Sequence, residues 1–118
     1  MKTSFKKPLY LSFGILLGSL SLSASAGSLS EEYIRDYCSS DERTAVNIMS
    51  SRQDGIKLSK WIEFARSRED EQSRKYIEAL VRWAYSEPKF TSDAYKEEAV
   101  NKFSNQVYMR CVETLKKR

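Results

Sequence analysis

Hydrophobic residues after position 27 recur every three or four positions, which is the period of one face of an α-helix. Four such stretches follow one another, at residues 28–55, 58–67, 71–85 and 91–118. No segment alternates cleanly between polar and apolar residues, as a half-buried strand would. The pattern therefore predicts an all-α fold of four helices, within a range of three to five, packed antiparallel in one small domain.

Capping residues and helix breakers mark the ends of these stretches. Residues 28–31 have the spacing of a capping box, and Gly55 is expected to end the first helix in a left-handed conformation. Pro88 is expected to end the third helix. A second capping-box spacing at residues 39–42 leaves two interpretations. The first helix either runs through these residues or breaks and restarts there, and we expect it to be continuous.

The first 26 residues have the order of a secretory signal peptide. A positive start with three lysines leads into an apolar run of 14 residues from Leu9 to Leu22, and Ala24-Ser25-Ala26 has the form of a cleavage site. The run is shorter than the roughly 20 residues of a membrane-spanning helix. We therefore expect residues 27–118 to form a single domain in the periplasm, with no stable membrane anchor after cleavage. An uncleaved anchor is the alternative.

Removal of the signal peptide changes the charge of the protein. The full chain holds 20 basic and 16 acidic side chains, and its isoelectric point is about 9.1. Three of the lysines lie in the signal peptide, so 17 basic residues remain against 16 acidic ones. This balance does not favour a nucleic acid as the partner, because phosphate binding needs a clustered excess of Lys and Arg.

The two cysteines of the chain, Cys38 and Cys111, both follow the signal peptide. In an oxidising compartment an even pair predicts one disulfide. Each cysteine lies on the apolar face of a long predicted helix, so the bond would join the first helix to the last. Two free thiols and a bond between two chains are the alternatives.

The chain contains no histidine, which is the commonest general base and metal ligand. It also lacks a glycine-rich phosphate loop. Neighbouring acids such as Glu31 and Glu32 lie on a helix surface, where they do not face each other across a cleft. These observations predict a protein that is not an enzyme and holds no metal or cofactor. A carboxylate-dependent cell-wall hydrolase is a less favoured alternative.

Four residues are candidates for an interaction surface. Arg52 and Gln53 precede Gly55, so the turn is predicted to present them, with a solvated last helical turn as the alternative. Phe64 and Trp83 lie at the margins of their apolar stripes, where core packing is the alternative. Arg and Trp are enriched at protein interfaces. We therefore expect the partner to be another periplasmic or secreted protein.

Several short segments resemble small exported proteins of Gram-negative bacteria. These segments are residues 49–55, Ala84-Tyr85 with Pro88, and Phe103, Val107 and Cys111. The resemblance implies an all-helical periplasmic protein and carries over no catalytic or ligand-binding residue. The leading hypothesis is an inhibitor or immunity protein against a cell-wall-targeting enzyme. The alternative is a periplasmic stress chaperone, although the small acid-stress chaperones have cysteines that lie much closer together in sequence.

Overall fold

The computed structural model describes residues 28–118, which form four helices and no strand. The helices are α2 (Glu31–Gln53), α3 (Leu58–Arg66), α4 (Glu71–Ser86) and α5 (Asp93–Lys116). This confirms the predicted all-α, four-helix class. The predicted signal peptide, residues 1–26, lies outside the described residues. None of the helices within residues 28–118 is long and apolar enough to cross a membrane.

Three of the four helices begin at a polar side chain that accepts a hydrogen bond from the first turn, whereas Lys57 at the start of α3 forms no such bond. Ser30 caps α2 through the amide of Tyr33, and Ser92 caps α5 through the amide of Tyr95. The cap of α2 is therefore Ser30 and not Ser28, with which the predicted capping box begins. Helix α2 runs without a break through residues 39–42, which confirms the expected continuity.

The end of α2 is a Schellman motif built on Gly55. Gly55 has φ +84°, a conformation in which a side chain would be strained. Its amide donates to the carbonyl of Arg52, and the amide of Ile56 donates to the carbonyl of Ser51. These two bonds satisfy carbonyls that the helix end leaves free. The chain then reverses into α3, as the predicted glycine cap implies.

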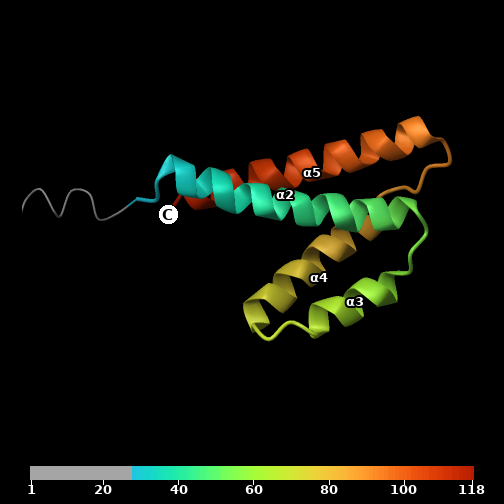
Figure 1. Cartoon of the computed structure of the whole chain (residues 1–118), viewed down its shortest axis with the longest axis horizontal. Coiled ribbons are helices and arrows are strands. Elements are labelled where there is room, and N and C mark those ends of the chain that lie inside the picture. Colours follow the sequence, from blue (N-terminus) through green and yellow to red (C-terminus); the bar gives the residue numbers. More distant parts are fainter. Residues whose placement is uncertain (1–27) are drawn as a thin grey trace, which may run out of the picture.

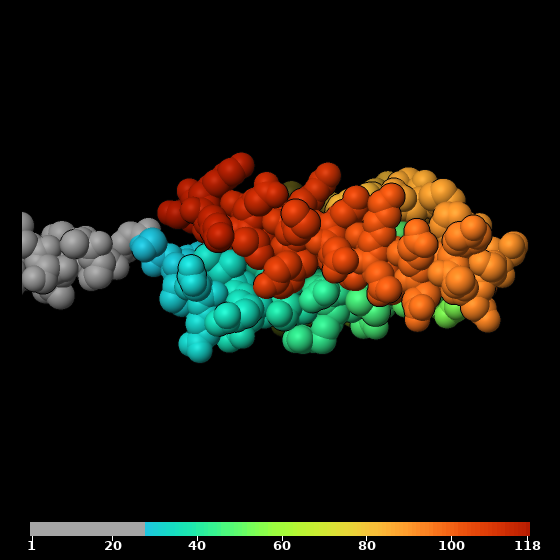
Figure 2. Space-filling view, turned by 90° about the horizontal axis from the view of Figure 1, so that it is seen from above, coloured from blue at the N-terminus to red at the C-terminus, as the bar shows by residue number. Residues whose placement is uncertain are grey.

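Helices α2 and α5 form a long antiparallel pair, and seen from above they lie side by side along their length (Figures 1 and 2). Helices α3 and α4 form a shorter hairpin that packs against the second half of α2 (Figure 1). All four helices contribute to the main core. Its buried side chains are Ala45, Ile48, Met49, Ala65, Ile77, Leu80, Val81, Ala84, Phe103 and Val107.

The start of α2 and the end of α5 extend beyond the α3–α4 hairpin (Figure 1). There the two helices share only a small cluster of buried residues, Ile34, Cys38 and Leu115. The Cys38–Cys111 disulfide lies in this cluster and joins Cα atoms 5.6 Å apart across a sequence separation of 73 residues. The predicted disulfide is confirmed, and it fastens the part of the helix pair that has the least core around it.

Candidate functional site

A groove of about 730 Å³ lies between α4 and the paired α2 and α5. It opens because α4 diverges from that pair toward its own N-terminus (Figure 1). We call it the α4–α5 groove. Its lining residues are Tyr37, Asp41, Asp70, Gln72, Ser73, Tyr76, Ala79, Leu80, Trp83, Val107, Arg110, Cys111, Thr114, Leu115 and Arg118.

Trp83 lines the groove and bridges α4 to α5. Its ring meets Phe103 edge to face, with the ring centres 4.8 Å apart. The guanidinium of Arg110 lies over the tryptophan ring, 4.5 Å from the ring centre. Such a cation–π contact is favourable even at a partly exposed site. Trp83, predicted as an interaction residue, therefore lines the groove from α4, and two side chains of α5 hold its ring in place.

A hydrogen bond between α4 and α2 also lines the groove. The hydroxyl of Tyr76 donates to Oδ2 of Asp41 over 2.8 Å. Partial burial raises the pKa of Asp41 above its usual value, and the bond from Tyr76 opposes this rise. Burial and the neighbouring carboxylate raise the pKa of Tyr76 as well. The phenol therefore stays protonated and remains a donor to Asp41.

Asp70 stands at the N-terminal end of α4, on the rim of the groove. Its Oδ2 accepts hydrogen bonds from the amide and from the hydroxyl of Ser73, both at 2.9 Å. These bonds favour the ionised form and lower the pKa of the carboxyl. Asp70 therefore acts first as the N-cap of α4. The groove nevertheless holds two aspartates whose pKa values are displaced in opposite directions.

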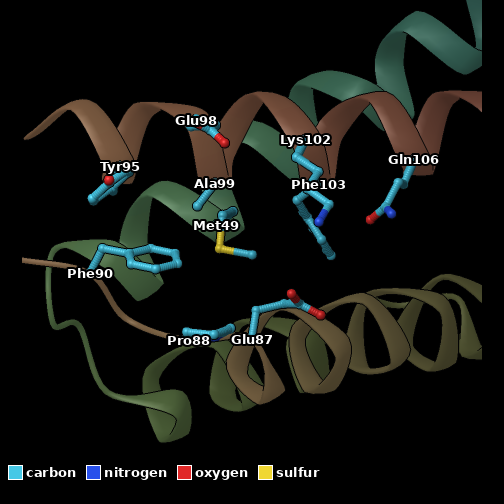
Figure 3. Close-up of a pocket in the computed structure, with 10 residues that line it drawn as sticks. All are labelled: Met49, Glu87, Pro88, Phe90, Tyr95, Glu98, Ala99, Lys102, Phe103 and Gln106. Carbon is cyan, nitrogen blue, oxygen red and sulfur yellow. The ribbon is translucent and has the colours of Figure 1, made fainter.

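A smaller pocket of about 220 Å³ lies between the first half of α5 and the connection from α4 to α5 (Figure 3). Met49 forms its floor, with Phe90 and Tyr95 on one side and Phe103 on the other (Figure 3). Its remaining lining residues are Glu87, Pro88, Glu98, Ala99, Lys102 and Gln106. This pocket is about a third of the size of the groove, and the polar side chains at its rim face open solvent.

Arg52 and Gln53 hold this connection in place. Two guanidinium nitrogens of Arg52 donate to the carbonyl of Glu87, at 3.1 and 3.0 Å. The amide of Gln53 donates to the carbonyl of Pro88 over 2.9 Å and accepts from the amide of Phe90 over 2.8 Å. Gln53 is only 1% exposed. The prediction that the turn presents Gln53 at a surface is therefore wrong, because the side chain is buried and both of its polar atoms form hydrogen bonds within the protein.

Phe64 lies on α3, which contributes no residue to the groove. It is 45% exposed, packs edge to face on Trp61 and lies under the guanidinium of Arg68. Of the four predicted surface residues, only Trp83 therefore lines the groove. Asp41, Tyr76 and Arg110 were not among the predicted site residues, because only the crossing of α4 over the α2–α5 pair brings them together.

The groove combines several kinds of side chain. Aromatic rings, two arginines and a hydrogen-bonded carboxyl surround an apolar floor made by Leu80, Val107 and Leu115. Within residues 28–118, no three His, Cys, Asp or Glu side chains are placed to hold a metal ion. No family model, curated protein or solved structure matches the chain. Its function is therefore inferred from the groove.

Proposed function

We propose that the chain is a periplasmic binding protein that inhibits a cell-wall-targeting enzyme by docking a segment of that enzyme in the α4–α5 groove. The periplasmic location rests on the signal-like residues 1–26, and the Cys38–Cys111 disulfide is compatible with a location outside the cytoplasm. An inhibitor needs a binding surface and no catalytic group of its own.

One observation carries this proposal: the groove brings together residue types that dominate the binding energy of protein interfaces. Trp, Tyr and Arg are enriched among such residues. Trp83, Tyr37, Tyr76 and Arg110 all line the groove. Their hydrophobic surface is partly accessible, and Trp83 is already fixed by Phe103 and Arg110. A side chain that is ordered before binding loses less entropy on association.

The test fills the groove without touching the core. Thr114 is exposed and lines the groove, so Thr114→Trp places a bulky ring in it. The matched control is Asn105→Trp, which adds the same ring to an exposed position of α5 outside both hollows. The measurement is the rate at which cell-wall hydrolases clear a peptidoglycan suspension when the chain from residue 27, with its disulfide intact, is added.

We expect the unmodified chain and Asn105→Trp to slow at least one hydrolase, and Thr114→Trp to lose at least tenfold in potency. The inhibitor proposal is overturned if no hydrolase of a broad panel is slowed. The assignment to the groove is overturned if both tryptophan variants inhibit equally well.

A carboxylate-dependent hydrolase is a second candidate, and a single observation favours it. Asp41 and Asp70 line one groove, and their pKa values are displaced upward and downward. Glycosidases use two carboxyls that face each other across a cleft, one as the acid and one as the ionised partner. The same suspension separates the two functions, because a hydrolase clears it unaided. Clearing that is lost in Asp41→Asn would support this candidate, and no clearing would exclude it.

A further inference from the structure

We infer that the occupant of the α4–α5 groove is an amphipathic α-helix of the partner protein, with acidic residues along the edge that faces α5. The inference rests on the proposed binding function and specifies what the groove takes. Three features of the groove lead to it: the spacing of its lining residues, the lack of a strand to pair with, and the distribution of charge on its rims.

The side chains that line the groove recur at helical spacing on both walls. On α5 they are Val107, Cys111 and Leu115 along the floor and Arg110, Thr114 and Arg118 along the rim, each four residues apart. On α4 they are Tyr76, Leu80 and Trp83. Rows of side chains at this spacing form the ridges and grooves into which another helix packs. A helix laid between α4 and α5 would meet such rows on both sides.

The arrangement of the four helices also leaves a place for such a neighbour. Helix α5 packs along α2, and α4 packs on α2 and α3. The contact between α4 and α5 is carried by large side chains, with Trp83 of α4 on Phe103 of α5. An amphipathic helix that inserts its apolar stripe between α4 and α5 would cover the sides that these two helices leave open to the groove.

A helical occupant and an extended one differ in the hydrogen bonds that their backbones need from the groove. An extended peptide must find partners for its own amides and carbonyls, and it usually finds them at the edge of a sheet. Residues 28–118 contain no strand, so this part of the chain offers no such edge. A helix satisfies its backbone internally and brings only side chains to the groove.

The charged residues on the rims set the orientation of the helix. Arg110 and Arg118 line the groove from α5, whereas Asp41 lines it from α2 and Asp70 from the N-terminal end of α4. In the described residues, neither arginine forms an ion pair with a carboxylate. Acidic residues on the partner helix would therefore meet Arg110 and Arg118, and the edge that faces Asp70 would be neutral or basic. Opposite charges placed in this way favour one orientation and reject others.

The volume of the groove is sufficient for a few anchoring side chains of the partner helix. Pockets of about 300–1,000 Å³ enclose a drug-sized ligand, and the groove measures about 730 Å³. A helix that docks in a groove does so through anchors at positions i, i+3 or i+4, and i+7. We expect two or three apolar anchors over about two helical turns, with the acidic residues between them on one side.

The test is a selection from a display library of random peptides about four helical turns long. The bait is the chain from residue 27 with its disulfide intact, which contains all four described helices. Peptides that also bind the Thr114→Trp variant are removed. The expected survivors carry apolar residues three and four positions apart with Asp or Glu on one flank, and they gain helical circular dichroism when they bind.

Two variants then test the orientation with the selected peptides. Arg110→Glu reverses the charge on the α5 rim and should weaken binding at least tenfold, whereas Asn105→Trp should leave it unchanged. A peptide with its acidic residues replaced by lysine should regain affinity for Arg110→Glu.

Three results would overturn the inference: survivors rich in proline or without helical spacing, survivors indifferent to Arg110→Glu, or no enrichment over unselected peptides. These results are independent of the hydrolase assay. Helical binders without hydrolase inhibition would leave the groove assignment intact and remove the proposed target. If Thr114→Trp abolishes inhibition but the library yields no helical binders, the inhibitor function and its assignment to the groove stand. Only the inference of a helical occupant is then overturned.

Discussion

At the scale of single residues, the amide of Gln53 joins the end of α2 to the connection between α4 and α5. Two of its hydrogen bonds, to the carbonyl of Pro88 and from the amide of Phe90, use both the nitrogen and the oxygen of the side-chain amide. Buried polar groups of the backbone cost free energy when they lose their partner. Gln53 therefore stabilises a connection that otherwise contains few internal hydrogen bonds.

Replacement of Gln53 by alanine should destabilise the protein. The change leaves the amide of Phe90 and the carbonyl of Pro88 without partners, at a cost of about 2–3 kcal/mol in the free energy of unfolding. Urea denaturation measures this cost. The control is Gln106→Ala, which truncates an exposed glutamine and should stay within about 0.5 kcal/mol of the unmodified chain. Equal stability of the two variants would show that the Gln53 bonds contribute nothing.

Asp41 gives a prediction about pH. Burial raises its folded-state pKa above the unfolded value, so the folded protein holds this proton more tightly. The resulting stabilisation is present below the unfolded pKa and is lost as the pH rises through the folded pKa. Asparagine carries no charge and still accepts the hydrogen bond from Tyr76. Asp41→Asn should therefore raise the melting temperature at neutral pH and leave it nearly unchanged near about pH 3. A lower melting temperature at neutral pH would contradict this interpretation.

At the scale of elements, the helix pair is unevenly supported. The second half of α2 and the first half of α5 belong to the main core, whereas the opposite end relies on Ile34, Leu115 and the disulfide. Stability in proteins is often distributed in this way, with local openings where buried contacts are few. The disulfide therefore acts on the end of the pair that is most prone to separate.

Conversion of both cysteines to serine should lower the free energy of unfolding by between about 3 and 4.7 kcal/mol, the range of the chain-entropy model for loops of this order. Amide hydrogen exchange should locate the effect. Amides around Val81 and Ile48, which are fully buried, should lose protection in step with the free energy of unfolding, and amides at the start of α2 and the end of α5 should lose more. Uniform loss of protection would mean that the disulfide stabilises the whole molecule and not one end. Ser40→Ala, a change at an exposed position of α2, serves as the control.

At the scale of the whole molecule, the sequence was informative about the helices and their ends, and silent about the groove. The spacing of apolar residues predicted all four helices, Gly55 predicted the turn after α2, and the even pair of cysteines predicted their bond. Each of these is a local property of the chain or depends on one pair of residues. The groove depends instead on the direction in which α4 leaves the α2–α5 pair, which hydrophobic spacing alone does not determine.

The same difference explains why Gln53 was misassigned and why two other candidates, Trp83 and Phe64, could not be distinguished from the sequence. Gln53 was predicted at a surface because a polar residue beside a glycine turn is usually solvated. Its burial follows from the connection at Pro88 and Phe90, which lies 35 to 37 residues away in the sequence. Trp83 and Phe64 have equivalent positions at the margins of their apolar stripes. Trp83 differs because the packing of α4 against α5 brings it onto Phe103, whereas Phe64 packs on Trp61 of its own helix. Long-range packing, and not helix periodicity, distinguishes the two.

An open apolar groove with a basic rim should be visible in the folded protein through the fluorescent dye anilinonaphthalenesulfonate. Its aromatic rings suit the floor made by Leu80, Val107 and Leu115, and its sulfonate suits Arg110 and Arg118. We expect enhanced fluorescence under conditions in which near-ultraviolet circular dichroism shows fixed tertiary packing, since binding by a molten globule would occur without it. Thr114→Trp should remove the enhancement and Asn105→Trp should preserve it. Equal dye binding by the two variants would place the accessible apolar surface outside the groove, and the absence of binding by the unmodified chain would show that the groove is closed in solution.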